Sequence, residues 1–173
     1  APSHVHSLDG FADGGKAIDS DTFKNWFGDW QSAAELGSLR EVHGSNQAKN
    51  AAKLFKNQPL TNRDSGITAN ISGESLRKMM SKSSRVGSVS DLAHYHAIAN
   101  LDHLFRAALL RESRPPREGK DKSDVYQYHH FDVPLPFEGE TLRAKILAEA
   151  YGDTKKGTRL NNLASAQIMK ATP

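Results

Sequence analysis

The chain has 173 residues, of which 37% are hydrophobic, and it contains no cysteine. This length allows one sizeable core with an additional arm, and the lack of cysteine excludes disulfides and thiolate metal sites. No apolar run is long enough to cross a bilayer, and the net charge of +3 permits a polyanionic partner without requiring one.

Residues 1–44 are rich in Gly, Asp and Ser and predict an N-terminal arm with one short helix. The opening stretch APSHVHSLDG shows no signal-peptide pattern and is typical of a cut inside a longer polypeptide. Within DSDTFKNWFGDW, aromatic side chains recur at three- and four-residue spacing and form one apolar stripe. The stripe, which either docks the arm onto the main body or binds a partner, consists of Phe23, Trp26, Phe27 and Trp30.

The next part of the chain, up to residue 110, predicts three helices and one short strand. Pro59 ends the first helix, Ser72 is a suitable N-cap for the second, and either Ser90 or Asp91 caps the third and longest. In order, the expected segments are a helix in 45–60, a strand in 66–72, and helices in 73–83 and 92–110.

The pattern then changes from helices to strands. The charged stretch RESRPPREGKDKSD holds two prolines and predicts a flexible loop over 111–124. Alternating strands are expected at 125–135, 140–150 and 158–168. Residues 45–173 therefore predict an α+β domain, with the helices packed on one face of a small antiparallel sheet.

The first two strands predict a hairpin whose turn centre is the dipeptide at 138–139. That register pairs Val133 with Ala144 and places His129 on the apolar side. Its neighbour His130 lies on the other face, together with hydroxyl, carboxylate and basic side chains. Pattern alone therefore favours His130 as the exposed member of the pair.

Several longer segments resemble a known family. They are FKNWFGDW, TNRDSGITANIS, HAIANLDHLFRAAL and YHHFDVPLPFEGETLRAKI, which together resemble the large-polyvalent-protein-associated group and the related phage barnase–EndoU–colicin–RelE-like nucleases of polymorphic toxins. The resemblance implies a metal-independent ribonuclease site on the sheet face opposite the helices, and it prefers His129. Either a bulge between His129 and Phe131 or a sheet end where the helices no longer cover the apolar face would reconcile that preference with the strand pattern. Relatives often carry histidine at the place of Lys78, and their last strand differs from TRLNNLAS.

Cleaving RNA without a metal ion requires a base for the ribose 2′-hydroxyl, an acid for the leaving oxygen, and cations for the phosphate. Histidine suits both proton roles, and lysine or arginine suits the third. We expect His129 or His130 to be the base and His96 or His94 the acid, with Lys78 stabilising the phosphate. Further candidates for phosphate binding are Lys53, Ser81, Arg143, Lys145 and Thr158.

These side chains also have ordinary structural interpretations, such as a solvated helix surface for the lysines. His96 and His103 lack a convergent third ligand, so no metal is expected, and no cofactor motif is present.

We therefore expect an endoribonuclease toxin or effector domain that cleaves tRNA or another structured RNA through a 2′,3′-cyclic phosphate. It would be delivered into the cytoplasm of a target cell, and a cognate immunity protein would inhibit it. The alternative is a non-catalytic interaction module of a phage or secretion-system polyprotein. A third possibility is ADP-ribosyl transfer, for which no convincing arginine–serine–glutamate set is found.

Overall fold

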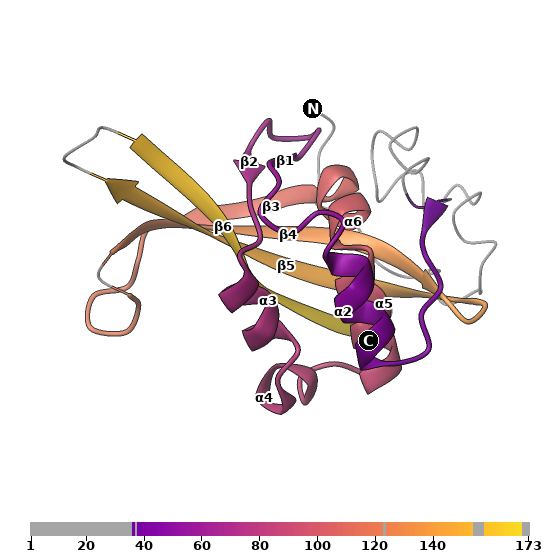
Figure 1. The fold of residues 1–173 in the computed structure, drawn as a ribbon. Coiled ribbons are helices and arrows are strands. Elements are labelled where there is room, and N and C mark those ends of the chain that lie inside the picture. The colour runs from indigo at the N-terminus through magenta and orange to yellow at the C-terminus, as the bar shows by residue number, and fades with distance from the viewer. Residues whose placement is uncertain (1–35, 37, 123, 154–157, 171–173) are drawn as a thin grey trace.

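The computed structural model describes residues 36, 38–122, 124–153 and 158–170 of the chain (Figure 1). Helices lie together on one side of an antiparallel sheet, which confirms the predicted α+β class. The predicted aromatic helix of the N-terminal arm lies outside the described residues. No helix in the described part of the chain combines the length and the apolar character needed to cross a membrane.

The helices precede the main sheet in the chain. The first half holds α2 (Ser45–Ala52), β1 (Leu60–Thr61), β2 (Thr68–Ala69), α3 (Gly73–Met79), α4 (Lys82–Arg85), α5 (Asp91–Ala99) and α6 (Leu101–Ala107). The second half holds β3 (Leu109–Arg114), β4 (Val125–Phe137), β5 (Glu140–Asp153) and β6 (Thr158–Lys170). The last four strands form one antiparallel sheet in the order β3-β4-β5-β6, and β1 pairs with β2 separately.

Three of the described helix starts, those of α3, α4 and α5, use serine caps, and the caps of α3 and α5 are the ones that the sequence predicts. The hydroxyl of Ser72 accepts a hydrogen bond from the amide of Ser75 at 3.1 Å, and that of Ser90 accepts one from Ala93 at 3.1 Å. Each bond satisfies one of the amides that a helix start leaves unpaired, which is worth about 1 kcal/mol.

The prediction of one long helix over 92–110 is wrong. Asn100 separates α5 from α6, and its side chain forms hydrogen bonds with both the amide and the carbonyl of Arg40. Its carboxamide oxygen accepts from the Arg40 amide at 2.6 Å, and its amide nitrogen donates to the Arg40 carbonyl at 2.9 Å. The helix is therefore interrupted at Asn100, where the side chain bonds a segment that is distant in the sequence.

The predicted flexible loop over 111–124 is also partly wrong, because β3 occupies its first residues. This strand is the edge of the sheet and pairs with β4, with Ser113 opposite His129 and Glu112 opposite His130. Charged side chains are common on edge strands, because they prevent pairing with other chains. Only the segment after Arg114 connects the two strands as a loop.

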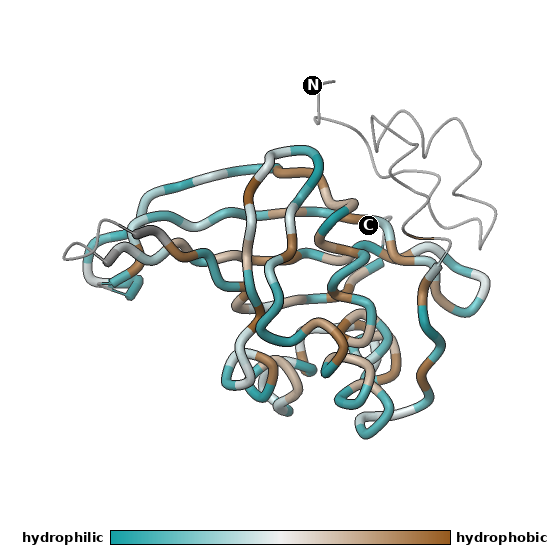
Figure 2. Tube along the Cα trace, turned by 45° about the horizontal axis from the view of Figure 1, so that its top comes forward, coloured by the Kyte–Doolittle hydropathy of each residue, from teal (hydrophilic) through white to brown (hydrophobic). Residues whose placement is uncertain are grey.

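The predicted hairpin register is confirmed. Phe131 pairs with Ile146, Val133 with Ala144, and His129 with Ala148. Glu138 and Gly139 form the turn with positive φ values of 50° and 74°, as a two-residue type I′ connection requires. Neighbouring side chains therefore alternate between two faces, which the alternating hydropathy along the long strands reflects (Figure 2).

One sheet face packs against the helices and forms the core. The ring of Phe131 meets that of Phe105 from α6 edge-on at 5.0 Å between centroids. Further buried side chains on this face are Val133, Leu135, Leu142, Ala144, Ile146 and Ile168. The helices α2, α3, α5 and α6 lie on this side of the sheet (Figure 1), which leaves the opposite face to carry the polar residues of the strands.

Candidate functional site

The sheet face opposite the helices carries a continuous set of charged and hydrogen-bonding side chains, which we call the polar sheet face. It consists of Arg111, Glu112 and Arg114 from β3, Tyr128, His130 and Asp132 from β4, and Arg143 and Lys145 from β5. Alternation along β4 and β5 puts these residues on one side, while β3 supplies the rest from the sheet edge.

Asp132 is the centre of this face and is almost fully buried. Its Oδ2 accepts a hydrogen bond from Nε of Arg111 at 3.0 Å and one from an Nη of Arg143 at 2.6 Å. The Asp132 side chain is 4% exposed, whereas the two arginines remain 20% and 25% exposed. One carboxylate therefore holds two guanidinium groups in place, and the cluster keeps a net positive charge at the surface.

His130 lies next to this cluster, between Glu112 on β3 and Leu147 on β5. Its Nε2 is buried and has no hydrogen-bond partner in the described part of the chain. Burial lowers the pKa of His130, and the charges of Arg114 and Lys145 lower it further against the opposing effect of Glu112. The imidazole is therefore neutral at pH 7 and can accept a proton.

Beyond His130, toward the start of β4, the side chains of the polar sheet face contact one another. The guanidinium of Arg114 lies over the ring of Tyr128, 4.5 Å from its centroid. Glu149 accepts from Lys122 at 3.1 Å and from the hydroxyl of Tyr151 at 2.8 Å. Burial and this hydrogen bond raise the pKa of Tyr151 to about 12, so its hydroxyl stays protonated.

His129, which the family resemblance prefers, lies on the helix-covered side and is buried. Its Nδ1 shares a hydrogen bond with the hydroxyl of Ser113 at 2.7 Å. Burial lowers the pKa of His129, as does the neighbouring His130. Pairing of β4 with β5 is regular from Gln127 onward, so the bulge after His129 that would reconcile the two predictions does not form.

The structure does not bring His94 to the polar sheet face. His94 is fully buried, with Nε2 2.7 Å from the carbonyl of Met79 and Nδ1 2.8 Å from the hydroxyl of Ser88. Because a carbonyl only accepts, Nε2 carries the proton and Nδ1 accepts from Ser88. Both ring nitrogens are therefore occupied, and burial lowers the pKa of His94. This is the environment of a structural histidine.

His96 is also separated from the other histidines, because it lies at the hairpin turn. Its Nε2 is 3.2 Å from the carbonyl of Pro136, six residues along β4 from His130. Six residues of a strand span ~20 Å, so His96 cannot donate a proton to a group that His130 contacts.

The predicted phosphate-binding residues also fall into separate groups. Arg143 and Lys145 belong to the polar sheet face, whereas Lys53 is exposed just beyond the end of α2. Lys78 pairs with Glu74 at 3.4 Å on the surface of α3, and Ser81 caps α4. These helical residues lie on the side of the sheet away from His130. The side chain of Thr158, at the start of β6, lies outside the described residues.

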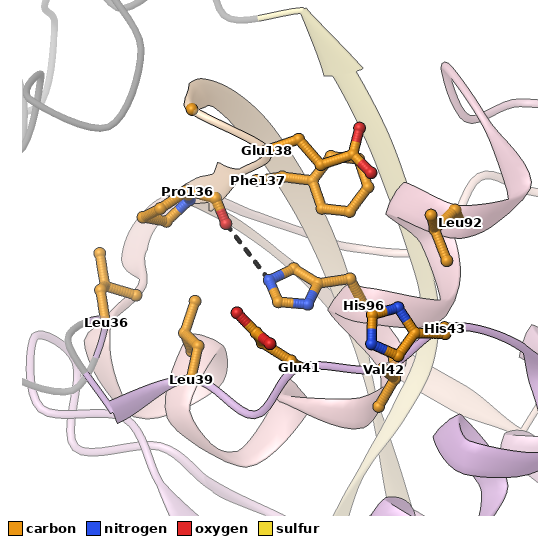
Figure 3. A pocket seen from close by; sticks show the side chains of 11 residues that line it. Leu36, Leu39, Glu41, Val42, His43, Leu92, His96, Pro136, Phe137 and Glu138 are labelled. Atoms are coloured by element: carbon orange, nitrogen blue, oxygen red, sulfur yellow. Dashed lines mark hydrogen bonds between the residues drawn. The ribbon is translucent and has the colours of Figure 1, made fainter.

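His96 lines a second candidate site, a pocket of about 360 Å³ at the hairpin turn, which we call the hairpin pocket. Figure 3 shows the His96 ring in the middle of this pocket, with the carboxylate of Glu41 pointing toward it and Phe137 on the opposite side. Burial lowers the pKa of His96, although its bond to Pro136 and the charges of Glu41 and Glu138 oppose that effect. No group of three or more His, Asp or Glu side chains within the described ranges is arranged to hold a metal ion.

Three residues of the polar sheet face were missed by sequence reasoning: Arg111, Glu112 and Arg114. They belong to the stretch LLRESR, which follows a helical pattern directly and ends at two prolines. In this stretch, the charged residues Glu112 and Arg114 stand at the two-residue spacing of a strand. A pattern within six residues is too short to distinguish a strand from a loop.

A protein-family model described as large polyvalent protein-associated domain 3 matches residues 43–161, which is more than half of the chain. The match runs from the approach to α2 into β6 and includes the whole polar sheet face. It confirms the polyvalent-protein part of the resemblance, while the relation to barnase–EndoU–colicin–RelE-like nucleases stays a prediction. No curated protein and no solved structure matches the chain.

Proposed function

The chain belongs to the large polyvalent protein-associated domain 3 family, and from that premise we propose that it is a metal-independent endoribonuclease effector domain. The observation that carries the proposal is His130, a neutral imidazole with an unpartnered Nε2 in the described part of the chain, set among the charged groups of the polar sheet face. A buried polar atom without a partner is rare in native proteins, and a catalytic role is one of its explanations.

In the proposed reaction, His130 takes the proton of a ribose 2′-hydroxyl. The 2′-oxygen then attacks the adjacent phosphorus, and the bond to the 5′-oxygen breaks. Lys145 is the cationic acid on the same face that supplies a proton to the leaving 5′-oxygen. The products are a 2′,3′-cyclic phosphate and a free 5′-hydroxyl, which balances atoms and protons without a nucleophile from the protein.

The remaining charges suit the phosphate and the protonated histidine. Glu112 raises the proton affinity of His130 and stabilises the imidazolium that forms. Arg143 and Arg111, both held by Asp132, provide fixed positive charge for the pentavalent phosphate without reorganisation. His129 contacts Ser113 on the other side of the sheet and takes no part.

Such an activity harms any cell that contains it. We therefore propose that the domain acts in the cytoplasm of a target cell after delivery, and that a cognate inhibitory protein covers the polar sheet face in the producing cell. The net charge of +3 is compatible with RNA and with an acidic inhibitor.

One observation favours a second candidate, a non-catalytic interaction module. Three of the four predicted catalytic histidines, His94, His96 and His129, bond to protein groups and do not converge. A domain that had lost catalysis would keep such structural histidines and its fold.

Expression in bacteria separates the two candidates. We expect the unmutated chain to inhibit growth and to fragment total RNA, whereas His130→Ala abolishes both effects. His129→Gln is the matched control, because it changes the adjacent residue on the opposite face and should leave RNA cleavage intact. Normal growth and intact RNA in cells that contain folded, unmutated chain would refute the nuclease proposal and favour the interaction module.

A further inference from the structure

The hairpin pocket has a composition that the proposed nuclease reaction does not use. Its walls are largely apolar and include Leu39, Val42, Leu92 and the ring of Phe137. Its charged lining residues are two carboxylates, Glu41 and Glu138, and none of the described lining residues is lysine or arginine. A chain with a net positive charge thus has a locally negative pocket, which repels phosphate.

Two histidines, His43 and His96, line the pocket, and His96 adds a hydrogen-bond acceptor. Because the carbonyl of Pro136 only accepts, the bond at 3.2 Å requires the proton on Nε2 of His96. The neutral ring therefore offers Nδ1 as an acceptor, beside carboxylates that accept only. Burial disfavours protonation of His96 and so keeps this acceptor available at pH 7.

These groups fit one kind of ligand. Carboxylates and an unprotonated ring nitrogen bind N–H donors, aliphatic walls bind a hydrocarbon stem, and an aromatic ring attracts a cation. A volume of about 360 Å³ lies at the small end of the range for small-molecule sites. We propose that the hairpin pocket binds an alkylguanidinium cation, with its positive end toward the carboxylate of Glu41 beside His96, its stem against Leu39 and Phe137, and Glu138 adding negative charge at the rim.

The same chemistry occurs in a free alkylguanidine and in an arginine side chain of a peptide. The pocket is formed by the β4–β5 turn together with α5 and the segment before α2, and Figure 3 shows the lining side chains that these parts contribute. It lies ~20 Å from His130 along β4. The inference is therefore independent of the proposed function.

Nuclear magnetic resonance titration of the full chain tests the proposal with three probes: agmatine, N-acetyl-arginine amide and N-acetyl-citrulline amide. Citrulline has nearly the same shape as arginine but no charge. We expect agmatine or the arginine derivative to shift the resonances of His96 and Phe137 with a Kd of about 1 mM, and the citrulline derivative to bind at least tenfold more weakly. Binding of agmatine alone identifies a free small cation as the ligand, and binding of the arginine derivative identifies a peptide side chain.

Variants complete the test. Glu41→Gln combined with Glu138→Gln should weaken binding of the cation about tenfold, while Glu140→Gln should not, because Glu140 is exposed next to the turn but does not line the pocket. Equal binding of the arginine and citrulline derivatives, no shift with any probe, or an unchanged Kd in the double variant would overturn the proposal. His130→Ala should leave the Kd unchanged, which keeps this result separate from that of the nuclease proposal.

Discussion

Replacing Asp132 with asparagine should destabilise the protein more than any exposed charge substitution. The carboxylate is 4% exposed and accepts from Arg111 at 3.0 Å and from Arg143 at 2.6 Å. Both arginines donate to the same oxygen, Oδ2. An amide keeps the shape of the side chain and can place its oxygen there, but it loses the charge, so two charge-assisted hydrogen bonds become bonds to a neutral acceptor and two partly buried cations lose their counter-charge.

The magnitude follows from these two bonds. A hydrogen bond to a charged group contributes about 1.5–3 kcal/mol, and the upper end applies to pairs that are fully buried. Because the arginines are 20% and 25% exposed, water partly replaces the lost partner. We therefore expect Asp132→Asn to lower the free energy of unfolding by about 2–3 kcal/mol.

Urea unfolding followed by circular dichroism measures this difference, with an unchanged m value showing that the unfolded state is the same. Glu74→Gln is the control, because the pair of Glu74 and Lys78 is 68% and 62% exposed and should contribute about 0.5 kcal/mol or less. Equal stabilities of Asp132→Asn and Glu74→Gln would refute the assignment of Asp132 as the buried centre of the polar sheet face.

Three further predictions concern stability and its pH dependence. Burial alone would raise the pKa of Asp102, but bidentate hydrogen bonds from Arg40 at 2.8 and 2.9 Å and the charge of His103 outweigh it and lower the pKa. Asp102→Asn should therefore lower the free energy of unfolding by about 2–3 kcal/mol at pH 7. In urea unfolding across a pH series, the difference in free energy between the unmutated chain and the variant should shrink below about pH 4, where the carboxylate of the unfolded chain takes up a proton. Burial lowers the pKa of His94, as it does for His96, His129 and His130, so the unmutated chain should lose stability as the pH falls below about 6.5. His94→Asn should make that part of the same pH series less steep, and an unchanged slope would contradict the buried neutral state of His94. Gly139→Val should cost about 1–2 kcal/mol in a thermal unfolding experiment, because φ of 74° suits glycine and strains a β-branched residue; an unchanged Tm would contradict the type I′ turn.

The hairpin could be predicted because its information is local. Alternation along both strands and a Glu-Gly turn define the register, so the opposite faces of His129 and His130 follow from spacing alone. The serine caps at Ser72 and Ser90 are local in the same sense, since each bonds an amide three residues ahead.

Features that depend on distant partners were not predicted. The helix break at Asn100 is stabilised by the backbone of Arg40, sixty residues away in the sequence. Without that contact, the stretch continues as a good helix pattern. Strand β3 likewise exists because β4 offers an edge to pair with, and without that partner the sequence around Glu112 predicts a loop.

The separation of the candidate histidines has the same origin. Sequence places His94 and His96 on one helix near a sheet, but it does not tell which atoms fill their hydrogen bonds. Met79 and Ser88 bind one of them, and Pro136 binds the other, all from different segments. Tertiary packing thus decides which histidine keeps a ring nitrogen without a protein hydrogen-bond partner, and among the described residues of the polar sheet face this is His130.

The proposed cleavage of RNA by His130 and its neighbours is tested most directly with purified protein. A labelled structured RNA is incubated in EDTA with the unmutated chain, His130→Ala and His129→Gln, after circular dichroism has shown that all three are folded. We expect fragments ending in 2′,3′-cyclic phosphate for the unmutated chain and for His129→Gln, and a rate at least about 100-fold lower for His130→Ala. Intact RNA with the unmutated chain, or equal cleavage by His130→Ala, would contradict the proposal.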